Sequence, residues 1–126
     1  MRKLFLAAIL AVPSTVAIAP SALAWTEIAN RDVKEIRERD EISLPDDRQF
    51  HRIRVCAYGN PVHFRDFDIY YANGEHRDVT VRSLIAPGTC TRSIEFEHPR
   101  NIARIVFKYE QAGWFIGRAT VRVFGE

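Results

Sequence analysis

The segment between residues 63 and 82 holds the densest group of side chains that could do chemistry. It contains two histidines, three aspartates, one glutamate, three arginines and two tyrosines within twenty positions. Asp66 and Asp68 are two residues apart, so on a strand they would share a face, with roughly 6 to 7 Å between them. Carboxylate pairs of glycoside hydrolases have separations in this range. The two histidines, His63 and His76, could in principle bind a metal ion together.

Neither kind of site is expected if this segment forms a β-hairpin. A glycosidase pair needs a cleft and one acid with a raised pKa, whereas Asp66 and Asp68 are expected to be ionised on an open sheet face. His63 would begin the first strand and His76 would lie beside the turn, on the order of 30 Å away. We therefore interpret the segment as the solvent face of a sheet, predict no catalytic residue and no metal site, and do not expect an enzyme.

The rest of the chain adds no chemical motif. It contains no G-x-S-x-G, H-E-x-x-H or C-x-x-C sequence and no phosphate-binding glycine loop. Acidic residues cluster at 38–41 and 45–48, where a calcium ion is conceivable, but neither cluster has EF-hand spacing. No cofactor is therefore expected.

The N-terminus has the three parts of a secretory signal: a basic start at Arg2 and Lys3, an apolar stretch, and small residues before Trp25. We predict that residues 1–24 are a cleaved signal peptide and that 25–126 form one periplasmic or secreted domain. The apolar stretch is too short for a transmembrane anchor in the mature chain. Loss of the two basic residues lowers the formal net charge from +2 to zero, so nucleic acid is not an expected partner.

Both cysteines, Cys56 and Cys90, lie in the predicted mature domain. An even number of cysteines in an oxidising compartment is most simply explained by one disulfide, although two separate buried thiols are the alternative. We predict the disulfide, which would also make a cysteine nucleophile unavailable.

Turn residues recur at short intervals, at 44–47, 58–61, 72–75, 86–88, 97–101 and 111–113. Between them lie short runs rich in valine, isoleucine and aromatic residues with alternating polarity, as in residues 50–58, 91–97 and 119–125. This pattern predicts an all-β fold: an antiparallel β-sandwich, jelly-roll-like or Ig-like, with about eight strands. Residues 25–44 fit a charged helix or two short strands with a turn near Asp40, and we prefer the strands.

Two hairpins can be aligned by matching their apolar faces, because a slip of one residue would turn every core side chain to water. In the first, a bulge near Arg65 or Asp66 reconciles two phases of alternation. The predicted pairs are Phe67 with Val81, Ile69 with Val79, Tyr71 with Arg77, Asp66 with Arg82, and Asp68 with Thr80. In the second, a loop at 111–113 predicts Tyr109 opposite Phe115, Phe107 opposite Gly117, and Ile105 opposite Ala119.

The second hairpin carries apolar residues on the face opposite the core. Val106, Trp114 and Ile116 would lie there, and they form the best candidate binding patch because aromatic anchors dominate interface energies. The alternative is that another segment, such as the one holding Trp25, covers the patch.

Three short segments give the chain a recognisable pattern: Y-x-N-G at 71–74, P-G-x-C-T-R at 87–92, and V-x-V-x-G at 121–125. With the strands around them, they resemble a family of small secreted bacterial proteins of unknown function. The resemblance implies a compact periplasmic β-sandwich and no reaction. We therefore expect a non-enzymatic binding or structural module whose partner is an envelope component or another protein. The alternative is a hydrolase or carbohydrate-binding module that acts on envelope glycans.

Overall fold

A computed structural model describes residues 25–33, 39–44, 47–109 and 118–126 of the chain. The predicted signal peptide, residues 1–24, lies outside these residues. The described strands are β1 (Thr26–Val33), β2 (Arg39–Ser43), β3 (Gln49–Tyr58), β4 (Val62–Tyr71), β5 (His76–Ile85), β6 (Thr89–Cys90), β7 (Ile94–Tyr109) and β8 (Ala119–Gly125). Helix is absent from the described ranges, so none of their elements could cross a membrane as a helix.

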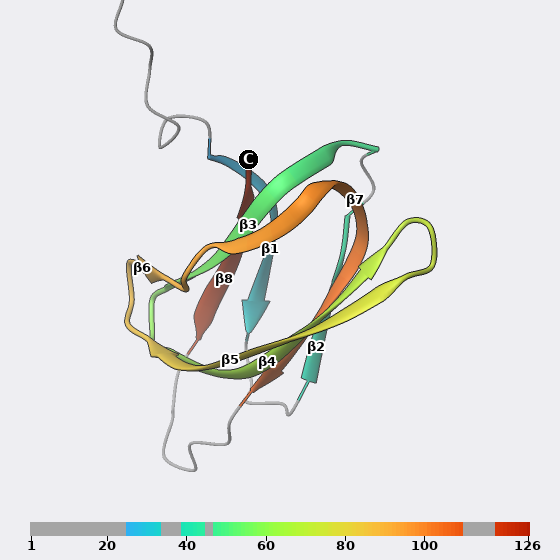
Figure 1. Cartoon of the computed structure of the whole chain (residues 1–126). Helices are drawn as coiled ribbons and strands as arrows, with labels where there is room; N and C mark the ends of the chain where they lie inside the picture. The colour runs from blue at the N-terminus through green and yellow to red at the C-terminus, as the bar shows by residue number, and fades with distance from the viewer. Residues whose placement is uncertain (1–24, 34–38, 45–46, 110–117) are drawn as a thin grey trace, which may run out of the picture.

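The strands form two layers that share one long strand (Figure 1). The first part of β7 pairs with β3, where Glu95 lies opposite Arg52, and β3 continues through β8 to β1. The second part of β7 pairs with β4 and β2, where Ile105 lies opposite both Ile69 and Ile42, and β4 continues to β5. Every pairing is antiparallel, which confirms the predicted all-β antiparallel sandwich.

The core lies between the layers because each strand alternates buried and outward residues. Ile53, Val55 and Ala57 of β3 are fully buried, as their shared parity predicts. From the other layer, Phe64, Phe67, Phe107 and Tyr109 form an aromatic cluster whose neighbouring rings lie 5.1 to 6.5 Å apart. These distances are typical of favourable aromatic pairs, so the cluster stabilises the packing of β4 on β7.

The predicted disulfide between Cys56 and Cys90 is present. Cys56 is opposite Cys90 in the short ladder between β3 and β6, and the Cys56 side chain is fully buried. The bond therefore fixes the connection between β5 and β7 onto the layer formed by β1, β8, β3 and the first part of β7.

The first predicted hairpin has the right faces but the wrong register. Phe67 lies opposite Val79 rather than Val81, a shift of two residues that keeps the predicted core residues of both strands buried. The shift arises because the turn is tight: the Tyr71 amide donates to the Glu75 carbonyl, and Gly74 adopts a φ of 93° that favours glycine. The register shift predicted near Arg65 is confirmed between Phe64 and Asp66.

The second predicted hairpin is wrong, because β8 pairs with β1 and β3 rather than with β7. Ile105 and Ala119 are both buried, but they belong to different layers. Matching apolar faces therefore brought together two strands that face each other across the core, not two neighbours in one sheet. The predicted loop at 111–113 lies outside the described residues.

The two strands predicted in residues 25–44 are confirmed, but Asp40 lies within β2 rather than in a turn. Its carboxylate is buried, with only 8% of the residue exposed, and it accepts hydrogen bonds from Arg31 Nε at 3.1 Å and from the Tyr109 hydroxyl at 3.3 Å. Burial, together with the negative charge of Asp40, raises the pKa of Tyr109 far above its ordinary value, so this hydroxyl remains a donor.

The Tyr109→Phe substitution should lower the free energy of unfolding by about 1 kcal/mol, because it leaves one lone pair of a buried carboxylate without its donor. Urea denaturation at neutral pH measures this loss. Tyr58→Phe is the matched control, since Tyr58 is only partly buried and its ring lies under Arg122. Equal stability of the wild type and Tyr109→Phe would contradict the assignment of this hydrogen bond.

Candidate functional site

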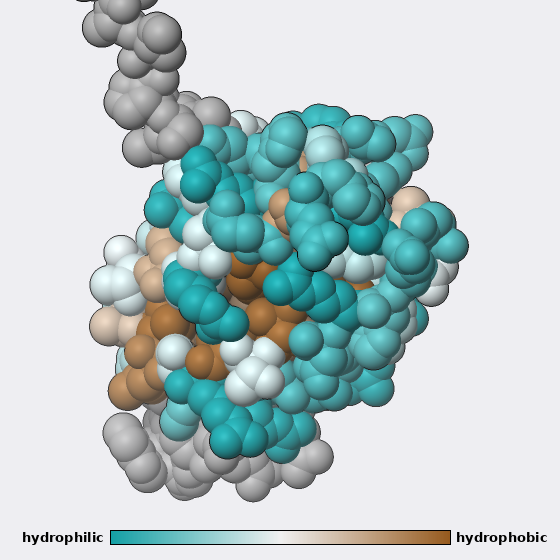
Figure 2. All heavy atoms as spheres, viewed as in Figure 1, coloured by the Kyte–Doolittle hydropathy of each residue, from teal (hydrophilic) through white to brown (hydrophobic). Residues whose placement is uncertain are grey.

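A groove of about 530 Å³ opens between β5 and the first part of β7. Figure 2 shows hydrophobic surface that runs from the centre of this side of the molecule toward its left edge, with hydrophilic residues above it and to its right. The residues that line the groove are Tyr71, Glu75, His76, Arg77, Glu95, Phe96, Glu97, His98 and Arg100. In the part of the chain that the structure describes, β5 pairs only with β4, and no ladder joins it to β7. The groove is therefore bordered by strand edges.

Two arginines link β5 to the chain that faces it, Arg77 within the groove and Arg92 beyond its end. Arg77 of β5 donates from Nη1 to the Glu95 carbonyl of β7 at 2.9 Å. Arg92, which precedes β7, donates from Nη2 to the Thr80 carbonyl of β5 at 2.8 Å. Side chains thus satisfy these two edge carbonyls, which in a continuous sheet would be satisfied by a neighbouring strand.

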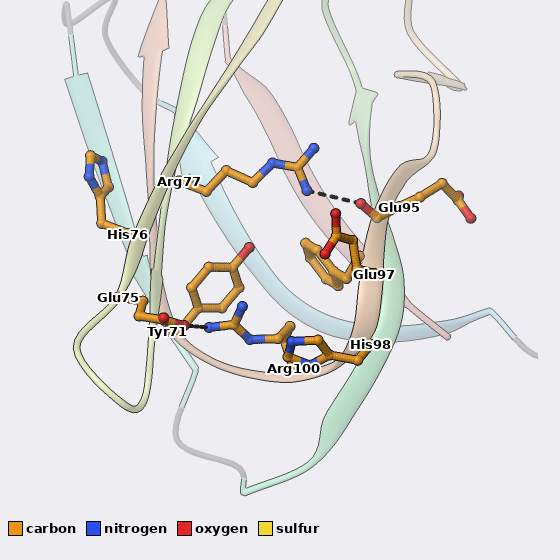
Figure 3. Close-up of a pocket in the computed structure, with 9 residues that line it drawn as sticks. Tyr71, Glu75, His76, Arg77, Glu95, Glu97, His98 and Arg100 are labelled. Carbon is orange, nitrogen blue, oxygen red and sulfur yellow. Dashed lines mark hydrogen bonds and ion pairs between the residues drawn. The ribbon is translucent and has the colours of Figure 1, made fainter.

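Arg100 fixes one end of the groove. Its guanidinium pairs with the Glu75 carboxylate and lies 3.6 Å from the centroid of the Tyr71 ring (Figure 3). Hydrogen bonds from Asn73 and then from Arg100 lower the pKa of Glu75, so its carboxylate remains the charged partner. The Phe96 ring packs perpendicular to Tyr71 at 5.9 Å, and only 6% of Tyr71 is exposed. The Tyr71 ring is therefore buried, with no open face.

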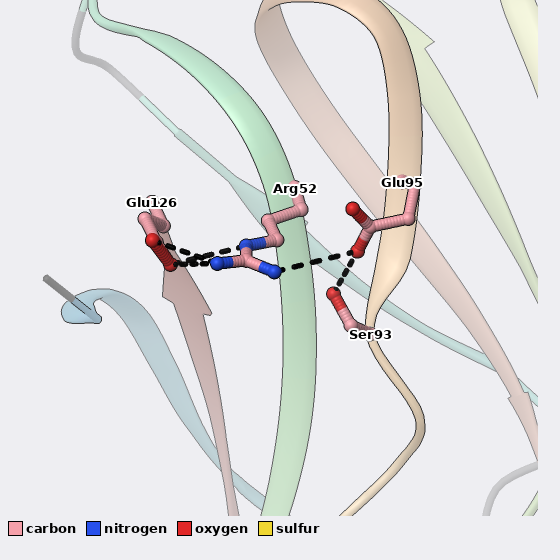
Figure 4. Close-up of polar contacts among 4 residues, drawn as sticks. All are labelled: Arg52, Ser93, Glu95 and Glu126. Carbon is pink, nitrogen blue, oxygen red and sulfur yellow. Dashed lines mark hydrogen bonds and ion pairs between the residues drawn. The ribbon is translucent and has the colours of Figure 1, made fainter. Parts of the chain in front are cut away.

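The lining residues differ in what they offer to a ligand. In Figure 3 the Tyr71 hydroxyl, the Arg77 guanidinium and the Glu97 carboxylate point into the space between the strands, whereas His76 points away on the other side of β5. The Glu95 carboxylate is also turned away, because it contacts Ser93 and Arg52, and Arg52 is held by Glu126 (Figure 4). The groups that remain for a ligand are thus a hydroxyl, a cation and an anion.

Asp68, which we predicted on an open face, is buried on the outer side of the second layer with 7% of its surface exposed. It accepts from Lys108 Nζ at 2.8 Å and lies 3.4 Å from His76 Nε2. Burial alone would raise the pKa of Asp68, but hydrogen bonds and Coulombic attraction from Lys108 and His76 outweigh it and lower the pKa. Asp66 lies opposite Lys108 in the ladder between β4 and β7, so Asp66 and Asp68 belong to one charge cluster with Lys108 and His76.

The remaining sequence candidates are not brought together. His63 lies opposite Leu84 and His76 opposite Tyr70, at the two ends of the β4–β5 hairpin. Among the described ranges, no three histidine, cysteine, aspartate or glutamate side chains are grouped to hold a metal ion. Asp40, in the first acidic cluster, is occupied by Arg31 and Tyr109.

The predicted binding patch lies largely beyond what the structure describes. Val106 is fully buried between Glu41 of β2 and Asp68 of β4, so it offers no contact to a partner. Trp114 and Ile116 lie outside the described residues, and the patch around them stays a prediction. Trp25 packs over Arg52 and Arg54 on the other layer, so it does not cover Val106.

The groove itself was not predicted from the sequence. The turn-like composition of residues 97–101 predicts a break between two strands, but these residues lie inside β7, where the chain passes from one layer to the other. The sequence did contain one signal for it, the three arginines at 77, 92 and 100, which lie in or next to the two strands that border the groove.

Comparisons with known proteins give a family and a fold. The family model "Domain of unknown function (DUF2541)" matches residues 4–125. A similar solved structure comes from "Structural and functional characterization of Pseudomonas aeruginosa AlgX", with a TM-score of 0.51 and 13% sequence identity. The match covers 80% of this chain but only 26% of that one, so the likeness concerns the fold of one part. No curated protein sequence matches the chain.

Proposed function

The chain belongs to the DUF2541 family, as its resemblance to a family of unknown function predicted, and on that premise we propose that it is a non-enzymatic binding module of the bacterial cell envelope. Its partner is held in the groove between β5 and β7. The observation that carries this proposal is that Arg77, Glu97 and the Tyr71 hydroxyl face one another across a space of about 530 Å³.

The rigidity of the groove walls supports a binding role. One wall is the β4–β5 hairpin, whose end is held by Arg100 through Glu75 and Tyr71. The other wall is β7, which is part of both layers. A preformed site loses little conformational entropy when its ligand binds. The few polar groups that converge on it provide orientation and specificity.

The charge cluster on the other side of β5 supports a role without catalysis. Hydrolysis of a glycan by an aspartate pair needs one carboxyl with a raised pKa to protonate the leaving group. The pKa of Asp68 is instead lowered, and Lys108 and His76 occupy its carboxylate oxygens. The cysteines are joined to each other, so neither supplies a thiolate nucleophile.

The envelope location rests on the sequence. Residues 1–24 have the composition of a secretory signal, and a disulfide persists best in an oxidising compartment. In fractionated cells, we expect the mature chain in the periplasmic or secreted fraction, with Trp25 as its first residue by mass spectrometry. A chain that kept residues 1–24 in the cytoplasmic fraction would contradict this location.

The groove is tested by amide chemical-shift mapping of the isotope-labelled mature domain. A peptide fraction and a glycan fraction of solubilised cell envelope are added separately. Binding of either fraction should shift amide signals of β5 and of residues 94–100. Arg77→Ala should weaken that binding about tenfold through loss of a charged hydrogen-bond donor.

Arg122→Ala is the matched control, because Arg122 is also an exposed strand arginine, but it lies on the other layer, where it pairs with Glu27 at 3.4 Å. Its binding should equal that of the wild type. Shifts that spare β5 and β7, or binding that Trp114→Ala removes and Arg77→Ala does not, would assign the site to the predicted Trp114 patch instead.

A further inference from the structure

Among the described strands, β5 pairs on one side only, and its outer edge runs from the groove at His76 past Asp78 to Thr80. The Thr80 carbonyl accepts from Arg92, so it points away from β4. The turn of the hairpin leads to the same orientation independently. The Tyr71 amide donates to the Glu75 carbonyl, so Tyr71 and Glu75 form a hydrogen-bonded pair, and the next pair, Tyr70 and His76, is not hydrogen-bonded. Following the ladder from either end, the residues whose N–H and C=O point away from β4 are His76, which lines the groove, and Asp78 and Thr80, which continue the same edge beyond it.

The groove is less suited to a sugar than to a strand. Sugar rings are held largely by stacking on an open aromatic face, which combines apolar area with a polar rim. The Tyr71 ring has Arg100 over it and Phe96 against it, and Tyr70 on the outer face lies between His76 at 4.6 Å and Arg104 at 3.7 Å. Neither ring is open to stacking, whereas the edge of β5 is open to backbone pairing.

We propose that the ligand of the groove is an acidic peptide segment that binds in extended conformation as an additional strand on the edge of β5. This inference rests on the proposed function, since it names the ligand class of the same groove. Addition of a strand to a free edge supplies affinity through main-chain hydrogen bonds, and side-chain pockets supply specificity. The outward residues span positions 76 to 80, which suits a peptide of about five to seven residues at about 3.3 Å each.

The acidic character follows from Arg92. A peptide that pairs with the edge donates its own N–H to the Thr80 carbonyl, which now accepts from Arg92 at 2.8 Å. The displaced guanidinium then needs another acceptor. A carboxylate on the peptide opposite Thr80 is the strongest one, because arginine and carboxylate form paired, charge-assisted hydrogen bonds.

The probe is a displayed library of random ten-residue peptides, selected on the folded mature domain. Selected peptides should be rich in aspartate or glutamate and in β-branched residues. Their affinity is measured by fluorescence polarisation with a labelled synthetic peptide. Methylation of alternate backbone nitrogens of that peptide tests which of its two edges pairs with β5. Methylation of the N–H groups that face β5 should abolish binding. Methylation of the N–H groups that face away from β5 should leave the affinity within about twofold.

The protein side of the contact is tested at Asp78. Asp78→Pro removes an N–H that lies on the outer edge of β5 and is not used in pairing with β4, so the sheet should tolerate it as edge strands do. It should weaken peptide binding at least about tenfold. Asp78→Ala keeps the N–H and removes a carboxylate that repels an acidic peptide, so it should bind slightly more tightly than the wild type. Arg92→Ala should weaken binding of the acidic peptide but not of its alanine counterpart.

The peptide experiments test the strand-addition inference, and the amide-shift mapping tests the proposed function, so the two can fail separately. If the library yields no peptide, or if both methylation patterns have equal effects, the strand-addition inference is overturned. The proposed function would still stand if the glycan fraction shifted the amides of β5 and β7. If neither fraction shifted those amides, both proposals would fall. Should Asp78→Pro prove unfolded by circular dichroism, the methylated peptides decide the question alone.

Discussion

Replacement of Cys56 and Cys90 by serine should lower the free energy of unfolding by roughly 3 to 4 kcal/mol. The two cysteines are 34 residues apart in the sequence, so the bond removes the freedom of a long loop in the unfolded chain. In the folded state the same bond holds a segment that has little other anchoring. β6 has only two ladder pairs with β3, supported by hydrogen bonds from Gly88 to Ala57 and from Thr91 to Val55.

Urea denaturation of the wild type and of the double serine variant measures this effect, with reduced wild type as the control. Reduced wild type and the variant should unfold at the same urea concentration, because both lack only the cross-link. The variant should also bind the groove ligand more weakly, since Arg92 lies directly after the segment that the disulfide anchors. A loss of less than about 1 kcal/mol would show that the ladder alone holds this segment.

The sequence was sufficient for the features that depend on residue parity and for the disulfide. Ile53, Val55 and Ala57 alternate with polar neighbours, and this alone places β3 with one face in the core. The disulfide was predicted from an even number of cysteines behind a predicted secretory signal, and it is present. Parity does not specify the neighbour of a strand, however. Ile105 and Ala119 have matching apolar faces whether their strands pair in one sheet or pack across two layers, and the structure has the second arrangement.

The candidate site could be predicted less well, because part of it consists of backbone groups. The edge of β5 offers N–H and C=O groups, which every residue type except proline carries and which composition does not reveal. Glu97 and Arg100 lie in a stretch with turn-like residues, and only the pairing of β7 with both layers turns that stretch into the wall of a groove. Long-range pairing also explains Asp68, since its partner Lys108 lies on a strand distant in sequence.

Lys108→Met should lower the free energy of unfolding at neutral pH by about 2 kcal/mol, because it leaves a buried carboxylate with only a partly exposed histidine as partner. Lys108 Nζ donates to Asp68 at 2.8 Å, and 29% of the lysine side chain is exposed, so the loss is smaller than for a fully buried pair. Urea denaturation at pH 7 measures it. Arg122→Met, which removes a more exposed ion pair with Glu27, should cost less than about 1 kcal/mol.

The pH dependence distinguishes a lost ion pair from lost packing. The folded-state pKa of Asp68 is lowered, so its contribution to stability is fully present above the unfolded value of about 4 and is lost as the pH falls through the folded-state value. Without Lys108, burial is opposed only by His76, and the pKa of Asp68 should rise. The wild type and Lys108→Met should therefore converge in stability on acidification, and the double variant Lys108→Met with Asp68→Asn should recover part of the loss at pH 7. A difference that stays constant from pH 7 down to pH 3 would instead assign the effect to the methylene groups of Lys108 that pack on the outer face of β7.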